Sequence, residues 1–502
     1  MGIESNKDAG TRRLDALDPH EAEDEAPYTV FTRPAIRAMV ALVGFAMLFS
    51  PLSANIYFPA MNQLQSDLGV STQLINLTIT AYLILQAIAP ALFGDAADII
   101  GRRPAFLAMF AVYTLANLGL GLQNSYPPLL VLRMVQSLGC SAAVAVSYGV
   151  VADVAMAADR GGLLGTAMIA TNLGPAIAPV IGGCILSRAG WHWIFWFLMI
   201  AGVVMLSLLA LLLPETARSI VGNGSIDPSP WRRALLSKCR SQSAVNQASG
   251  MQNNPLESAM QPQRRRTPNP LRSLRLVFYK DSFMVLLMSG TFYTIYYCLQ
   301  ASIATLFKEL YGYNDAIIGT CYLSIGFGVV TGGYLNGRLL DRNYTIVATD
   351  AGLEAGKRRV ADLTNFPIEK ARLLTMAYIQ IAHMGILIGY GWVVQHSLHV
   401  SVPLVFHFFL GFLETCIVQT FNTLLVDIFQ ESPSAAAASG NIFRCGLSAA
   451  GVAAMEPLMW RMGYGWYFTF LGLAGGILGL VGREVIVRMG MKWRQDRAGK
   501  QS

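Results

Sequence analysis

The sequence predicts an all-helical, polytopic membrane protein with twelve transmembrane helices in two six-helix pseudo-symmetric halves. Of its 502 residues, 54% are hydrophobic and only 13% are charged, whereas an average soluble domain carries about 25% charged residues. Twelve apolar stretches are each long enough to cross the roughly 30 Å of hydrocarbon in a bilayer. Because these stretches do not alternate with polar residues, we expect helices rather than the strands of a membrane barrel.

The expected spans divide six and six around a polar segment rich in Ser, Gln, Asn and Pro. The spans are 37–59, 74–95, 104–123, 127–151, 161–187 and 191–213, then 282–306, 314–340, 373–395, 401–427, 433–459 and 464–488. The expected organisation is therefore a disordered tail (1–36), a six-span half (37–213), a linker (214–281), a second half (282–488) and a tail (489–502). We interpret the linker as a flexible connection. Its basic run, Arg264 to Arg266, has two alternative interpretations, a contact with lipid or a phosphorylation site.

The distribution of Lys and Arg predicts the orientation. With the N-terminus inside, 32 of the 37 Lys and Arg residues flank inner ends of spans, and three (Arg188, Lys308 and Arg461) flank outer ends. Cytosolic loops carry such an excess of positive charge. We therefore expect both termini in the cytosol, and we attribute the net charge of +7 to the anionic inner leaflet rather than to nucleic acid. The acidic first 36 residues lack a signal-peptide core, and the plasma membrane is the expected location.

Two loops repeat one pattern at the same place in each half. Gly94 and Asp98 follow the second span, and Gly337 and Asp341 follow the eighth span, 243 residues further on. Such duplication is typical of transporters. The glycine lets two helices approach closely, and the aspartate can cap or pair at a helix end. A generic tight basic turn is the alternative interpretation.

These motifs resemble those of a known family. The segment from Gly94 to Arg103 resembles the signature loop of the major facilitator superfamily, and residues 130–139 resemble its span-4 motif. Residues 55–60 and 213–216 are similar to the fungal twelve-span drug:proton antiporter family, within which Gly337 to Tyr344 resembles the branch of quinidine-resistance transporters and citrate exporters. The second loop departs from the family pattern, with Asn343-Tyr344-Thr345 in place of Gly-Arg-Arg.

Three charged side chains fall well within spans, where charge is unfavourable and therefore marks function. They are Arg133 in span 4, Glu414 near the middle of span 10 and Arg444 in span 11. The resemblance implies a role in proton coupling for Arg133, and a lone buried carboxylate such as Glu414 suits a proton carrier because desolvation favours its neutral form. Two alternatives remain open: Arg133 is a structural hydrogen-bond hub, and Glu414 forms a permanent salt bridge with Arg444 or another partner.

Polar side chains within the spans are candidates for lining a central cavity. His407 lies in span 10, whereas we expect His383, in the peripheral span 9, to serve helix packing. The other cavity candidates are Asn55, Tyr57, Gln86, Asn172, Gln300, Gln419 and Asn422.

Two further groups of residues are expected at the inner gate and in span 5. The inner-gate candidates are Gly94, Asp98, Gly101, Arg102, Arg103, Gly337 and Asp341. The resemblance implies an antiporter motif that seals the cavity against ion leak, formed by Gly165, Gly174, Pro175, Gly182 and Gly183. A kinked packing helix is the alternative for span 5, since proline removes backbone donors and glycine permits close packing.

The sequence predicts a transporter and not an enzyme. It contains no phosphate-binding Gly-rich loop with Lys and no metal-ligand spacing, so neither ATP nor a metal or other cofactor is expected. The predicted function is proton-coupled export of a small organic molecule by a monomer that alternates between two access states. A citrate-like acid or an acidic metabolite is favoured because two guanidinium groups outnumber one carboxylate. Multidrug or toxin efflux and a transport-dead membrane sensor are the alternatives.

Overall fold

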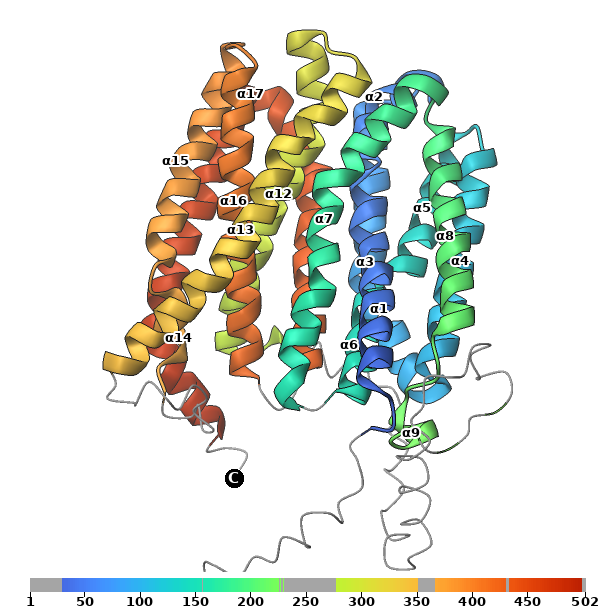
Figure 1. Cartoon of the computed structure of the whole chain (residues 1–502). Coiled ribbons are helices and arrows are strands. Elements are labelled where there is room, and N and C mark those ends of the chain that lie inside the picture. The colour runs from blue at the N-terminus through green and yellow to red at the C-terminus, as the bar shows by residue number, and fades with distance from the viewer. Residues whose placement is uncertain are drawn as a thin grey trace, which may run out of the picture.

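The protein is a bundle of long helices (Figure 1). The computed structural model describes residues 29–155, 157–224, 226, 229, 277–350, 366–429 and 433–498. All regular elements in these ranges are helical, which confirms the all-α prediction. Most of the predicted N-terminal tail and of the linker, including the run Arg264 to Arg266, lies outside the described residues.

The first half contains six spans built from eight helical segments. A short α9 (Arg218–Val221) follows the last of them. The segments are α1 (Arg33–Asn55) with α2 (Met61–Leu68), α3 (Thr72–Ile100), α4 (Arg102–Leu122), α5 (Tyr126–Ser141) with α6 (Ala143–Val154), α7 (Ala157–Ala189) and α8 (His192–Leu212). A 3-10 turn, η2 (Phe58–Ala60), links α1 to α2. Ala142 between α5 and α6 keeps right-handed helical angles (φ −80°, ψ −9°), so these two segments form one span.

The second half also contains six spans. Its segments are α12 (Lys280–Tyr311), α13 (Asp315–Asp350), α14 (Ile368–Leu373) with α15 (Met376–Gln395), α16 (Ser401–Ile428) and α17 (Pro433–Ala498). Eleven helices are long and apolar enough to cross a membrane, and α17 is two helices joined at Gly463, whose φ of 75° and ψ of 162° are not helical. The structure therefore has a helix for each of the twelve predicted spans.

Two helices extend past their predicted ends at the same end of the bundle. α13 continues from the predicted 340 to Asp350, and α17 continues from 488 to Ala498. The last turns of α17 are held by Arg494, which bonds both oxygens of Glu369 at 3.1 and 3.2 Å, and by Arg497, which lies 2.7 Å from Asp281. These partners lie outside the apolar runs, so hydropathy alone does not predict the extension.

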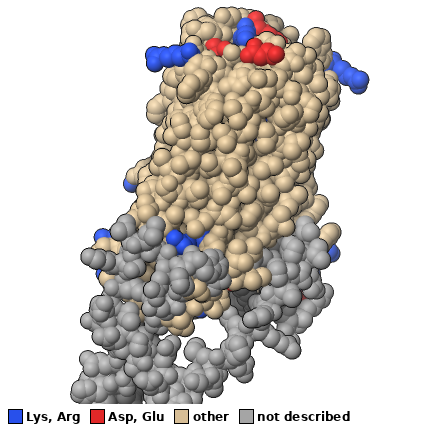
Figure 2. All heavy atoms as spheres, turned by 90° about the vertical axis from the view of Figure 1, so that its right-hand side faces the viewer, with Lys and Arg blue, Asp and Glu red and all other residues tan. Residues whose placement is uncertain are grey.

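The charges of the described residues avoid the middle of the bundle surface. On the face shown in Figure 2, a broad uncharged band separates charged groups at the two ends. Large apolar side chains are exposed on the outside of the bundle, for example Phe45 (61%) and Trp460 (84%). A surface of this kind is stable in contact with lipid rather than water.

Glycines of α7 allow close helix packing within and between the halves. A Cβ on Gly174 would lie 2.8 Å from Pro51 Cβ in α1, and a Cβ on Gly182 would overlap the carbonyl of Ile56. A Cβ on Gly183 would lie 2.9 Å from Gly319 Cα in α13. Pro175 and Pro179 lie inside the same helix, whereas Gly165 has open space around it. Span 5 is therefore a packing helix for both α1 and α13.

The halves meet along α7 with α13 and along α3 with α17. Four hydrogen bonds join them in the described chain. They are Asn62 to the carbonyl of Ala304 (2.9 Å), Asn76 to Glu456 (3.5 Å), Thr80 to the carbonyl of Ala449 (3.3 Å) and Asn441 to the carbonyl of Gln86 (2.8 Å). The bonds of Asn62 and Asn76 lie near the end of the spans opposite the last residues of α17, whereas the bond of Asn441 reaches the middle of α3.

Candidate substrate and coupling site

Arg133 of α5 lies at the centre of a buried network in the first half. Its guanidinium carbon is 4.2 Å from the ring centroid of Tyr57 and 4.5 Å from that of Tyr82. Nη1 donates to Gln136 Oε1 (2.6 Å) and to the carbonyl of Ser53 (3.2 Å). Only 1% of the residue is exposed. Two aromatic faces and two neutral acceptors therefore stabilise the cation.

The surrounding groups of Arg133 are all neutral. Gln136 donates to Asn117 Oδ1 at 2.6 Å, and Tyr57 and Thr78 share a hydrogen bond of 2.8 Å. Within the described residues, no carboxylate lies within ion-pair distance of Arg133, and its Nε has no hydrogen-bond partner. The network holds a full positive charge in the first half without an acidic counter-ion.

Arg444 of α17 occupies the boundary between the halves. Its guanidinium lies 4.5 Å from the Tyr293 ring of α12, and Nη2 donates to Asn441 Oδ1 at 3.1 Å. Asn441 also bonds the carbonyl of Gln86 in the first half. Arg444 is half-buried, its Nε has no partner, and no described carboxylate pairs with it. This second cation is therefore less enclosed than Arg133.

Glu414 of α16 pairs with a residue that the sequence suggested only for packing. Its Oε2 lies 3.0 Å from His383 Nε2 of α15, and the two residues are 4% and 2% exposed. The alternative in which Glu414 neutralises Arg444 is wrong for this structure, because α16 directs the carboxylate toward α15 rather than toward the half-to-half boundary. The predicted role of Glu414 as a proton carrier stays a prediction.

His407 packs inside the second half. Its ring stacks on Phe307 of α12 (centroids 5.5 Å apart, planes at 20°) and lies 5.0 Å from the ring of Tyr390 in α15. The residue is fully buried, and neither ring nitrogen has a hydrogen-bond partner among the described residues. Its neighbours are thus aromatic rings of its own half.

The remaining cavity candidates divide into three groups. Asn55 bonds the carbonyl of Pro51 in its own helix (2.7 Å), and Gln86 bonds Ser50 (3.4 Å). Asn172 and Gln419 converge on Gly333, where a Cβ would lie 3.6 and 3.3 Å from their amide nitrogens. Gln300 is 1% exposed on α12, while Asn422 is half-buried on α16.

The first repeated loop, predicted to contribute to an inner gate, forms a compact network. Arg102 pairs with Asp98 (2.5 Å) and Asp153 (3.1 Å), and its backbone amide donates to Glu215 (2.9 Å). Arg103 donates to the carbonyl of Ala210 at 2.8 Å. Gly101 has a φ of 109°, and a Cβ there would overlap the Glu215 carboxylate, so the turn requires glycine.

The second repeated loop is continuous helix and uses other residues. Gly337 and Asp341 lie within α13, and Gly337 has no neighbour that a Cβ would meet within 4 Å. Asn343, one of the residues at which the loop departs from the family pattern, bonds Thr375 at 3.0 Å. The ion pairs at this end of the second half are Arg372 with Asp427 (2.8 Å) and Arg494 with Glu369.

We expect Asp98→Asn to leave folding intact and to shift the resting population toward the inward-facing state. The Asp98 side chain is 62% exposed, and exposed ion pairs contribute about 0–1 kcal/mol. Asp98 lies in the last turn of α3 and pairs with the side chain of Arg102, so loss of this pair corresponds to a shift of up to about fivefold. The population is measured by introducing Gly165→Cys and labelling this cysteine from either side of the membrane. Unchanged labelling in Asp98→Asn, with Asp341→Asn as the control, would contradict the expectation.

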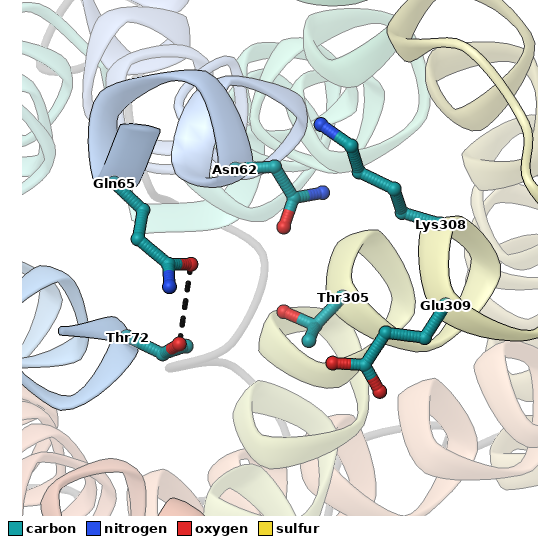
Figure 3. Close-up of a pocket in the computed structure, with 6 residues that line it drawn as sticks. All are labelled: Asn62, Gln65, Thr72, Thr305, Lys308 and Glu309. Atoms are coloured by element: carbon teal, nitrogen blue, oxygen red, sulfur yellow. Dashed lines mark hydrogen bonds between the residues drawn. The ribbon is translucent and has the colours of Figure 1, made fainter. Parts of the chain in front are cut away.

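Sequence reasoning missed acidic residues at the opposite end of the bundle. Glu456 lies within the predicted span 11 and accepts from Asn76 across the halves, and Glu309 accepts from Tyr464 at 2.9 Å. The rule that an intramembrane charge marks function would have found Glu456. Figure 3 shows a nearby pocket of about 340 Å³, in which α2 and α3 of the first half face α12 of the second. It is lined by Asn62, Gln65, Thr72, Thr305, Lys308 and Glu309.

Comparisons with known proteins identify the family. A model of the Major Facilitator Superfamily matches residues 43–453. MFS-type transporter phiD of a fungal species is 36% identical over 480 residues, covering 95% of this chain and 72% of phiD. Citrate exporter 1 of Aspergillus niger is 34% identical over 487 residues, covering 95% of this chain and 90% of the exporter.

A solved structure shares the fold. The human organic anion transporter MFSD10 (TETRAN) superposes with a TM-score of 0.55, at 16% sequence identity, over 91% of this chain and 100% of that chain. The twelve spans, the family match and the relatives agree. The chain belongs to the Major Facilitator Superfamily and is a multi-pass membrane transporter, not an enzyme.

Proposed function

We propose that this transporter exports a small organic acid, of the di- or tricarboxylate class, in exchange for protons across the plasma membrane. The observation that carries the proposal is the pair of cations within the spans, buried Arg133 and half-buried Arg444, one in each half, with no acidic partner in the described chain. A guanidinium stays protonated at every working pH. An anionic substrate compensates this charge, whereas a cation adds to it.

The two arginines are suited to different tasks. Arg133 lies against two tyrosine rings and is 1% exposed, so it fixes Tyr57 and Tyr82 and supplies positive potential. Arg444 lies against one such ring, is partly exposed, and its Nε has no partner among the described residues. It is therefore the arginine that we assign to direct contact with a substrate carboxylate, through charge-assisted hydrogen bonds.

Similarity to a named exporter supports the substrate class. Citrate exporter 1 is 34% identical to this chain along 90% of its own length. The hydrogen bonds of Asn62 and Asn76 between the halves support alternating access, because they join the halves at the predicted outer side and must break when that side opens. The Lys and Arg distribution supports an inner location of both termini.

A second candidate function is efflux of a planar drug-like or secondary-metabolite compound. Tyr293 and Tyr297 lie one turn apart beside Arg444, with ring centroids 4.9 Å from each other. Aromatic rings of this kind bind flat, apolar ligands as well as they stabilise a guanidinium. The substrate measurement below separates the two functions.

We expect Arg444→Lys to lower the rate of citrate exchange at least about tenfold, because lysine keeps the charge and loses the bidentate fork. The measurement uses purified protein in liposomes with labelled citrate and, separately, a labelled cationic drug. Arg461→Lys is the control, because Arg461 is exposed at the predicted outer end. Citrate exchange by Arg444→Lys at the parent rate, or transport of the cation alone by the parent, would overturn the organic-acid assignment.

A further inference from the structure

A carboxylate and an imidazole form an isolated buried pair in the second half. Glu414 of α16 and His383 of α15 are 4% and 2% exposed, and Oε2 and Nε2 are 3.0 Å apart. Apart from this contact, neither carboxylate oxygen has a hydrogen-bond partner among the described residues. The described part of the chain therefore places no guanidinium or ammonium group against the pair to compensate its charge.

The neighbours of the pair are neutral and come from three other directions. From α12, the Phe292 ring meets the His383 ring edge-on at 5.3 Å, and Tyr296 lies close enough to Glu414 to interact with it electrostatically. One turn before His383, Gln380 is fully buried and neither polar atom of its side-chain amide has a partner. From α17, Gly479 packs against that amide. Tyr296 is the titratable group that faces the pair from these elements.

This environment favours one bound proton. With one proton, the pair is either a carboxylic acid beside a neutral imidazole or a carboxylate beside an imidazolium, and both forms are neutral overall. With no proton the net charge is −1, and with two it is +1. A net charge in a site this enclosed is strongly unfavourable unless it is paired. The pair can thus hold and release a proton with only a short hydrogen-bond rearrangement.

Two tyrosines connect the pair to the arginine at the half-to-half boundary. The rings of Tyr296 and Tyr293 stack with centroids 6.5 Å apart, and the Tyr293 ring lies 4.5 Å from the Arg444 guanidinium. A change of charge at Glu414 therefore acts on Arg444 through one packed, water-poor row of side chains of α12.

We propose that His383 and Glu414 together form the binding site of the coupling proton, separate from the substrate contact at Arg444 and linked to it through Tyr296 and Tyr293. The proposal rests on the proposed proton-coupled transport. It assigns a functional role to His383, on a helix whose sequence suggested packing alone. It also explains why a buried carboxylate lies away from both unpaired arginines.

The test compares the parent with Glu414→Gln and His383→Asn in liposomes that contain a pH-sensitive dye. With the same pH on both sides of the membrane, we expect both variants to exchange labelled for unlabelled citrate at a rate within about threefold of the parent. The number of protons moved per citrate should fall at least tenfold in both variants. His399→Asn, at an exposed loop position, is the matched control and should behave as the parent. Parent-like proton movement per citrate in either variant would overturn the proposal.

Infrared difference spectroscopy provides a measurement that does not depend on the substrate. A pH-dependent carboxylic-acid band in the parent should disappear in Glu414→Gln and shift in frequency in His383→Asn. If the parent moves no citrate, the substrate assignment fails and the infrared bands still decide the proton site. Failure of both variants to insert as monodisperse protein would assign the pair to folding and overturn the proposal.

Discussion

Replacing Arg133 with lysine is expected to reduce transport about a hundredfold while leaving the protein inserted. Lysine keeps the charge but presents a compact ammonium, which cannot replace the planar guanidinium in its contacts with the rings of Tyr57 and Tyr82. A desolvated cation–π contact is worth about 2 kcal/mol, and a hydrogen bond to a charged group about 1.5–3 kcal/mol. Losing about 3 kcal/mol of the interactions that hold the cation in place lowers the transport rate roughly a hundredfold.

Arg133→Leu should abolish transport and also lower the melting temperature in detergent. Leucine leaves Gln136 Oε1 and the carbonyl of Ser53 without their donor in a site that is 1% exposed. A buried acceptor without a donor is unfavourable by about 1–3 kcal/mol. Arg188→Lys, at an exposed position, serves as the control. Transport at the parent rate in Arg133→Lys would show that the fork and the stacking are irrelevant.

Glu215→Ala is expected to destabilise the first half by at least about 3 kcal/mol. The carboxylate is 1% exposed and accepts from the backbone amides of Arg102 (2.9 Å), Thr216 (3.0 Å) and Ala217 (3.0 Å). Each hydrogen bond to a charged group contributes about 1.5–3 kcal/mol. The amide of Arg102 begins α4. Glu215→Ala therefore also removes the helix cap of α4, which connects the segment after α8 to the turn between α3 and α4.

The melting temperature in detergent checks this expectation, with Glu215→Gln as the conservative variant. Glutamine keeps an acceptor oxygen and loses the negative charge, so the melting temperature of Glu215→Gln should lie between those of the parent and Glu215→Ala. Glu484→Ala is the matched control, because Glu484 also has arginine partners but lies at the surface. Equal melting temperatures for Glu215→Ala and the parent would show that these three hydrogen bonds do not stabilise the fold.

The second half has a contact at the corresponding place, but it is an ion pair between side chains rather than a carboxylate bound to backbone amides. Glu215, which follows the last span of the first half, binds the amide that begins α4. Arg494, which follows the last span of the second half, binds Glu369 of α14 at the entry to α15. In both halves the segment after the sixth span holds the start of the third. The duplication is thus visible in contacts where the residue types differ.

The sequence alone determined the twelve spans, the helical class and the six-plus-six division. These features depend on local properties: the length of an apolar run and the unpaired backbone groups that a membrane does not tolerate. The break at Gly463 inside α17 likewise separates two apolar runs that the sequence already distinguishes. Arg133, Glu414 and Arg444 were found for the same reason, since a charge within an apolar run is visible locally.

Only the tertiary structure decided which charged groups meet. Glu414 binds His383 on the neighbouring helix rather than Arg444, and both arginines lie against tyrosines from helices distant in sequence. The direction in which a side chain points depends on how its helix is rotated and packed, which glycine contacts such as Gly183 with Gly319 set between α7 and α13. Apolar runs carry little information about rotation, because lipid accepts any apolar face equally. The pairing of charges is therefore a property of the assembled bundle.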